Sequence, residues 1–204
     1  MPRHEQGTLT RLGSRVGTPG ITWSDDRLVH ACLEGNEQAW AVLIEKYKNL
    51  IYSVPLKYGA SQSDAADVFQ SVCLKLFAEL PRLRQSAALR GWLLAVTTHE
   101  TFHTHKKQRR RGEQALTELE ETQLGTDPRA SPVIEEAERE QVLRDAVRGL
   151  SPRCQEIIKL LFYEEPPVPY RDLAKRLGLA TGSIGFIRGR CLKHLQRALE
   201  KAGF

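Results

Sequence analysis

Five consecutive residues, His99 to His103, form the stretch of this sequence that could carry out a reaction. They are HETFH, which fits H-E-x-x-H, a pattern in which two histidines one helical turn apart bind zinc and the glutamate acts as general base. A catalytic zinc ion also needs a third protein ligand and a shielded cleft. No third histidine follows at the usual spacing, and a cationic run begins at Lys106. We therefore predict no metal, no cofactor and no enzymatic activity, with a zinc metalloprotease as a remote alternative.

The cationic run itself offers a different chemistry. Five of the six residues at 106–111 are Lys or Arg, and the run continues a helical apolar pattern that starts at Trp92. It is either a solvated helix end, which the helix dipole favours, or a ridge of cations that binds phosphates. The candidates for phosphate contact are Lys106, Lys107, Arg109 and Arg110.

The segment from Tyr170 to Leu199 has the spacing of a helix-turn-helix. Ala174 is followed four residues later by Gly178, and Ile184 and Ile187 would face inward from the second helix. A small residue lets the two helices pack closely, and glycine allows a tight or positive-φ turn between them. The spacing therefore predicts two packed helices joined by a short turn.

The second of these helices would present a basic face to its surroundings. Thr181 stands where an N-cap is expected, so the helix should begin at Gly182. The segment 171–201 holds eight Lys or Arg against two Asp or Glu, a balance that suits the major groove of DNA and its phosphates. The alternative is a pair of packed helices with a solvated charged face. The candidate DNA contacts are Thr181, Ser183, Gly185, Phe186, Arg188, Arg190, Lys193 and Arg197.

A third candidate surface lies on the helix expected after Gly59. Ser63 is predicted to cap this helix, and Val68, Val72 and Leu76 give it a buried stripe. The opposite face is polar and is either simply solvated or a binding surface. Its candidate residues are Asp64, Asp67, Gln70 and Lys75.

The elements that must position these residues are all predicted to be helices. Two earlier helices should start at the caps Ser24 and Asn36, and Pro55 should end or kink the second. Residues 1–22 have few large apolar side chains, so we expect a disordered arm. No stretch alternates with the period of a strand. The predicted fold class is therefore all-α.

An acidic segment divides the chain. Residues 113–140 hold nine Asp or Glu against two Arg, and the part before Ser131 has no apolar period, as in a flexible linker. Pro132 and Pro152 stand at helix starts beyond it. We therefore expect two small helical domains joined by a flexible acidic linker. The predicted limits are 1–22 for the arm, 23–112 for the first domain, 113–130 for the linker and 131–204 for the second domain.

Composition agrees with two small domains of ordinary hydrophobicity. The chain has 204 residues, 41% of them hydrophobic, and a net charge of +5 that is distributed in blocks. No apolar run reaches the length of a membrane span, and the N-terminus lacks the apolar core of a signal peptide. The cysteines lie far apart without a C-x-x-C pair, so we predict buried, reduced thiols in a soluble cytoplasmic protein. They are Cys32, Cys73, Cys154 and Cys191.

The C-terminal residues resemble the promoter-recognition domain of bacterial sigma factors. Residues 150–195 begin with Leu-Ser-Pro, continue with an apolar helix and a loop ending at Tyr170, and include the turn LAKRLG, as in that family. The resemblance implies a helix-turn-helix of the winged-helix-like superfamily of sigma region 4, which binds the −35 promoter element.

The first domain resembles the same family independently. The segment DAADVFQSVCLKLF from Asp64 is similar to the family's D-A-E-D-L-x-Q-E-x-F helix, which binds the clamp helices of the largest subunit of RNA polymerase. The helix from Trp92 resembles the one that recognises and melts the −10 element, although His99 and His103 replace the usual Asn and Asp. The resemblance implies polymerase contacts for Asp64, Asp67, Gln70 and Lys75.

Because the chain is short and lacks a middle domain, it is identified as a member of the extracytoplasmic-function branch. The resemblance implies that the first domain docks on core RNA polymerase and opens the −10 element, while the second contacts the −35 element and the β-subunit flap. An anti-sigma factor would be a further partner. The alternative, a regulator that acts without polymerase, leaves the helix from Asp64 without a task. The implied −10 contacts are Arg82, Arg84, Gln85, Ser86 and Trp92.

Overall fold

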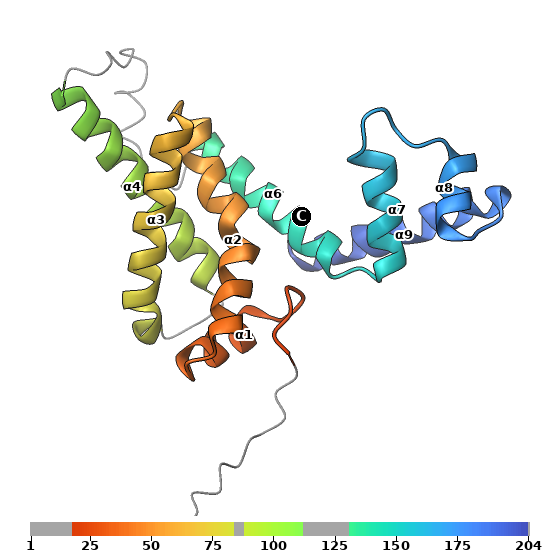
Figure 1. The fold of residues 1–204 in the computed structure, drawn as a ribbon, viewed down its shortest axis with the longest axis horizontal. Helices are drawn as coiled ribbons and strands as arrows, with labels where there is room; N and C mark the ends of the chain where they lie inside the picture. The colour runs from red at the N-terminus through yellow and green to blue at the C-terminus, as the bar shows by residue number, and fades with distance from the viewer. Residues whose placement is uncertain (1–17, 84–87, 112–130, 204) are drawn as a thin grey trace, which may run out of the picture.

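The computed structural model describes residues 18–83, 88–111 and 131–203 (Figure 1). Within these ranges the secondary structure is entirely helical, with eight α-helices and no strand, so the all-α fold class is confirmed for them. Most of the predicted N-terminal arm, the predicted linker and the loop residues Arg84, Gln85 and Ser86 lie outside the described residues. None of the described helices is long and apolar enough to cross a bilayer.

Four helices form a bundle around the larger of two apolar cores (Figure 1). Ser24 and Asn36 cap the first two as predicted, since their side chains accept hydrogen bonds from the backbone N–H of Arg27 and Ala39. The second helix ends two residues after Pro55, also as predicted. The four helices are α1 (Asp25–Leu33), α2 (Glu37–Lys57), α3 (Gln62–Glu79) and α4 (Leu89–Arg111).

The start of α3 differs from the prediction. Ser61, not Ser63, is the N-cap: its Oγ accepts a hydrogen bond from the Asp64 N–H at 3.1 Å, and its own N–H donates to the Asp64 carboxylate at 3.3 Å. This reciprocal capping box satisfies two backbone donors, whereas a single serine cap satisfies one. The prediction failed because two serines stood two positions apart and only one has an acidic residue three positions later.

The next helix, α6 (Pro132–Arg148), begins at the predicted proline and packs against α2. Its Ile134 and Ala137 belong to the core of the first bundle. The buried Gln141 donates its amide N–H to the backbone carbonyl of Lys46 at 3.1 Å, and Arg148 donates to the same oxygen at 3.0 Å. Hydrogen bonds to a backbone carbonyl of α2 therefore fix α6 on the bundle, a packing that the sequence does not predict.

An ion-pair cluster reinforces the same contact. The ammonium group of Lys57 lies 2.9 Å from a Glu136 carboxylate oxygen and 3.0 Å from one of Glu140. Hydrogen bonds from Lys57 to these two carboxylates raise the pKa of the lysine above its usual value, against a smaller lowering by burial. Two acidic residues of α6, Glu136 and Glu140, which the sequence shows only as part of a negative block, thus contact a specific cation on α2.

Beyond α6, three helices enclose a second, smaller core (Figure 1). Gly178 ends α8 in the left-handed conformation with φ 64°, and the Leu179 N–H donates to the Ala174 carbonyl at 2.8 Å, so the predicted glycine turn is confirmed. The predicted start of the last helix is wrong. Residues Thr181–Ser183 form a 3-10 turn, Thr181 makes no capping bond, and the helix begins at Ile184. The three helices are α7 (Pro152–Phe162), α8 (Tyr170–Leu177) and α9 (Ile184–Lys201).

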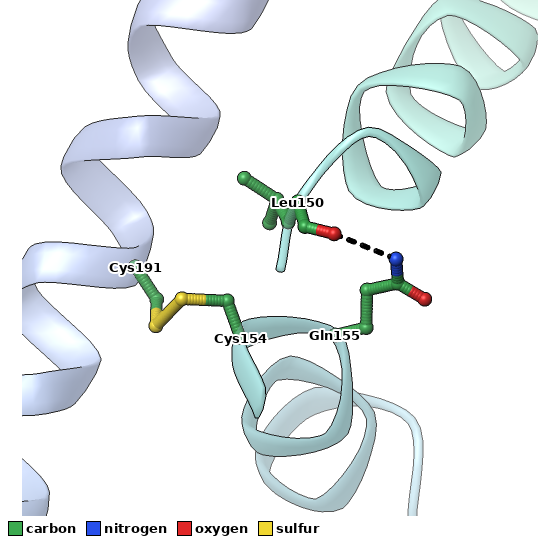
Figure 2. Close-up of a disulfide and its surroundings, with 4 residues drawn as sticks. All are labelled: Leu150, Cys154, Gln155 and Cys191. Carbon is green, nitrogen blue, oxygen red and sulfur yellow. Dashed lines mark hydrogen bonds between the residues drawn. A yellow bond between two sulfur atoms is a disulfide. The ribbon is translucent and has the colours of Figure 1, made fainter. Parts of the chain in front are cut away.

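The prediction of four reduced cysteines is wrong for two of them. Cys154 of α7 and Cys191 of α9 form a disulfide (Figure 2). Cys32 and Cys73 are free, and burial raises the pKa of both thiols, that of Cys32 to about 11. Linear spacing did not show the pairing, because the two bonded residues are 37 positions apart and meet only when α9 packs across α7.

Candidate nucleic-acid interface

The outward face of α3 carries two of the predicted polar residues, together with two apolar ones that the sequence motif does not single out. Asp67 and Gln70 are exposed, whereas Asp64 is partly buried and serves the capping box. Leu74 and Phe77 are 66% and 67% exposed and continue the same line at helical spacing. We call Asp67, Gln70, Leu74 and Phe77 the α3 strip.

The apolar half of the α3 strip is unusual for a solvated surface. Phe77 packs against Trp40 of α2, with ring centroids 5.4 Å apart, yet most of its area stays exposed. Neighbouring exposed apolar side chains bordered by polar ones are typical of a protein contact surface. The signal was present in the sequence, since residues 67, 70, 74 and 77 follow the outward helical period, but the prediction for this face rested on its polar residues alone.

Two predicted candidates turn out to bind each other. The ammonium group of Lys75, proposed for a polymerase contact, lies 2.6 Å from a carboxylate oxygen of Glu100, the acidic residue of the HETFH motif. His99 contacts the same carboxylate through Nδ1 at 3.1 Å. Burial alone would raise the pKa of Glu100, but hydrogen bonds from Lys75 and His99 outweigh it and lower that pKa.

This pairing occupies Glu100 in a contact between α3 and α4. His99 and His103 are both exposed, so they do not line a shielded cleft. In the described part of the chain, no three His, Cys, Asp or Glu side chains are grouped as metal ligands would be. The geometry therefore gives the HETFH residues a role in helix packing, and it gives no support to a zinc-activated water.

We predict that Glu100→Gln lowers the free energy of unfolding by about 1 kcal/mol at pH 7, because a charge-assisted hydrogen bond to Lys75 is removed. The lowered pKa of Glu100 means that its contribution is present above the unfolded value near 4.5 and is lost as the pH falls through the folded value. Urea unfolding at pH 7 and pH 3 should show the difference shrinking at pH 3. A constant difference across both pH values would contradict this role.

The candidates for −10 contact are only partly described. Arg82 projects into solvent and pairs with Glu79 at 3.1 Å, and Trp92 is partly buried against the first core. Lys106 and Lys107 are exposed on the last turns of α4. The structure does not bring Trp92 and these lysines together, since they lie about four turns apart along one helix. Arg109 and Arg110 belong to the end of α4, and their side chains lie outside the described part.

The exposed face of α9 is basic along its length. Phe186 is 74% exposed, the most exposed large apolar side chain of those described, and Arg188 stacks over the Tyr170 ring with its guanidinium carbon 5.8 Å from the centroid. Ser183 donates its hydroxyl to the Ala180 carbonyl at 2.7 Å, so it stabilises the turn before the helix. The other predicted contacts that are exposed here are Thr181, Gly185, Arg190, Lys193 and Arg197.

Arg190 lies beside a cavity on the α6 side of α9. It lines a cavity of about 590 Å³ between α9, the end of α6 and the start of α7. Asp145 of α6 and His194 of α9 line the same cavity. Burial raises the pKa of Asp145, against a smaller lowering by nearby Lys46. Of the predicted DNA contacts, Arg190 is therefore the one that lines this cavity, although its side chain is also exposed, whereas Phe186 lies on an open part of the helix.

Comparison with known proteins places this geometry in context. Residues 43–111, from α2 to the end of α4, match the family described as Sigma-70 region 2. The chain is similar to the ECF RNA polymerase sigma-E factor of Haemophilus influenzae, with 26% identity across 79% of the chain and 87% of that protein. It is also similar to the RNA polymerase sigma-H factor of Pseudomonas aeruginosa, with 22% identity across 86% of the chain and 94% of that protein.

Proposed function

Because this chain is a sigma factor of the extracytoplasmic-function type, a non-enzymatic protein that directs transcription initiation by RNA polymerase, we propose how its two helical units divide that work. The bundle of α1 to α4 docks on core polymerase and opens the −10 element. The unit of α7 to α9 carries a helix-turn-helix of the sigma region 4 type, α8 and α9, which binds the −35 element. The site of action is the cytoplasm.

The observation that carries the docking role is the α3 strip. It lies inside the region that matches Sigma-70 region 2, and it combines exposed Asp67 and Gln70 with exposed Leu74 and Phe77. A partner that buries such a surface gains apolar burial from the two large side chains and orientation from the polar pair. The clamp helices of the polymerase largest subunit are the proposed partner, and Lys75 assists indirectly by fixing α3 on α4.

The proposed DNA contacts follow from charge and exposure. Phe186 and Arg188 are open on the first turns of α9, where helix-turn-helix proteins reach base edges. Lys106 and Lys107 extend α4 as a cationic ridge, which suits phosphates near the −10 element. The loop with Arg84, Gln85 and Ser86, outside the described residues, is proposed to receive an extruded −10 base, and the β-subunit flap is the proposed partner of the second unit.

Run-off transcription tests this function. The purified chain, added to core polymerase and a pool of genomic fragments, should produce discrete transcripts whose start sites share two upstream elements at a fixed separation. Core polymerase alone serves as the control and should give no such set. Absence of any transcript that depends on the added chain would refute the proposed function.

A further inference from the structure

The disulfide between Cys154 and Cys191 joins α7 to α9 close to the end of α6. Cys154 is in the first turn of α7 and Cys191 is in the middle of α9, with Cα atoms 5.3 Å apart (Figure 2). Cys191 is 1% exposed and belongs to the small core itself. The bond therefore attaches α9, which carries the proposed DNA-binding face, directly to α7.

Gln155 connects the same place to α6. Its amide group donates to the carbonyl oxygens of Arg148 and Leu150, both at 2.8 Å (Figure 2 shows the second bond). Arg148 is the last residue of α6 and Leu150 lies in the connection that follows, so the start of α7 is held to the end of α6 by hydrogen bonds and to α9 by the disulfide. Loss of the disulfide removes the covalent half of this junction and leaves the hydrogen-bonded half.

The apolar core of the second unit, α7 to α9, is small. Its core contains seven described buried residues, and Cys191 is one of them, whereas the first bundle has a much longer set. Small cores depend on additional stabilisation such as disulfides. A cross-link that closes a loop of 37 positions is expected to raise the folding equilibrium constant of this unit by about 30-fold or more.

Small redox reagents have a route to the bond. Cys154 is only partly buried and lines the cavity of about 590 Å³ that Arg190 and His194 also line. The Arg190 guanidinium is cationic, and a cation near a cysteine favours its thiolate, the form that attacks a disulfide or a peroxide. Cys191 is enclosed, so an entering reagent meets the sulfur of Cys154 first.

We propose that Cys154 and Cys191 form a reversible redox pair that sets how firmly α9 is held for binding to the −35 element, an inference that rests on the proposed function. In reduction, a thiolate attacks Cys154 Sγ and Cys191 leaves as a thiolate. A second thiol then releases Cys154, so that two thiols become one disulfide and the protein gains two protons and two electrons. In oxidation by a peroxide, the two protein thiols lose two protons and two electrons, and the peroxide becomes two waters.

The direction of the switch follows from the compartment. Disulfides in cytosolic proteins are mostly transient and redox-sensing, because the surroundings keep thiols reduced. In the dithiol form α9 is held by the small core, the turn at Gly178 and its packing against α6, without a covalent bond to α7, so its amides open more often. In the disulfide form the helix is fixed to α7. Oxidising conditions thus favour −35-dependent initiation by this protein.

The experiment uses the full chain with core polymerase, after incubation with hydrogen peroxide or with dithiothreitol. Alkylation and mass measurement should give two free thiols in the oxidised form and four in the reduced form. Hydrogen exchange of the α7 and α9 amides should be at least about 10-fold slower in the oxidised form. The ratio of transcription from a promoter with an intact −35 element to one with a scrambled element should fall at least about 3-fold on reduction.

Two cysteine variants test whether the response depends on this disulfide. Cys154→Ser should resemble the reduced form under both treatments, whereas Cys73→Ser, the matched control on α3, should keep the full response. Four free thiols after peroxide treatment, or equal exchange rates in the two forms, would overturn the proposal. Because exchange is measured on the wild type, a variant that folds poorly does not decide the matter. No transcription in either form, with the exchange difference intact, would refute the proposed function and leave the redox pair supported.

Discussion

Replacing Asp67 and Gln70 by lysine should weaken binding to core polymerase by about 100-fold, with helical content unchanged. The two side chains are exposed on α3 and are not in the capping box that Asp64 forms, so the helix should tolerate the change. A like-charge mismatch within a docking surface costs several kcal/mol, so a mismatch at two adjacent positions is enough for a 100-fold effect. Co-purification and titration with labelled core polymerase give the affinity, and circular dichroism gives the helical content.

The matched control for this double variant makes the same change in charge at another exposed place. Asp26→Lys with Gln38→Lys alters α1 and α2 by the same three charge units, and both positions are exposed. This control should bind core polymerase within about 3-fold of the wild type, since surface charges away from a contact act mainly through weak, screened attraction. Equal weakening by both double variants would mean that net charge, not the α3 strip, governs docking.

The second large effect is expected at the −35 element. Arg190→Ala should reduce discrimination between preferred and altered −35 sequences by about 10-fold to 100-fold, because an arginine paired with a guanine edge supplies about 1–3 kcal/mol of specificity. Arg190 is exposed on α9, although it also lines the cavity beside α6. Selection of a randomised promoter library by the holoenzyme measures the preference at every position.

Neutralising Lys106 or Lys107 should act differently in the same selection. A phosphate contact adds affinity regardless of sequence, so its removal should weaken binding to all promoters alike and lower the salt slope by about one unit. Arg139→Ala, on the exposed side of α6, removes one positive charge elsewhere and should change neither the promoter affinity nor the salt slope.

For the arginine prediction, an unchanged −35 preference in Arg190→Ala would remove this residue from the base contacts and leave Phe186 and Arg188 as the candidates.

Features that depend on residues close together in the chain could be predicted from the amino-acid sequence. The caps at Ser24 and Asn36 and the left-handed turn at Gly178 use bonds that span only a few residues. Helical period also showed which side of α3 is buried and which is exposed. Two predicted helix starts were wrong. Ser61, not Ser63, caps α3, and a 3-10 turn at Thr181–Ser183 takes the place of the first turn expected for α9.

Tertiary structure alone decided which distant surfaces meet. The sequence showed an apolar face on α6 but could not show that Ile134 joins the first core, because many surfaces can bury the same area. Pairing of Lys75 with Glu100 and of Cys154 with Cys191 depends on how helices cross, and crossing depends on the packing of whole side-chain ridges. These long-range contacts pair Lys75 with Glu100 and join Cys154 of α7 to Cys191 of α9.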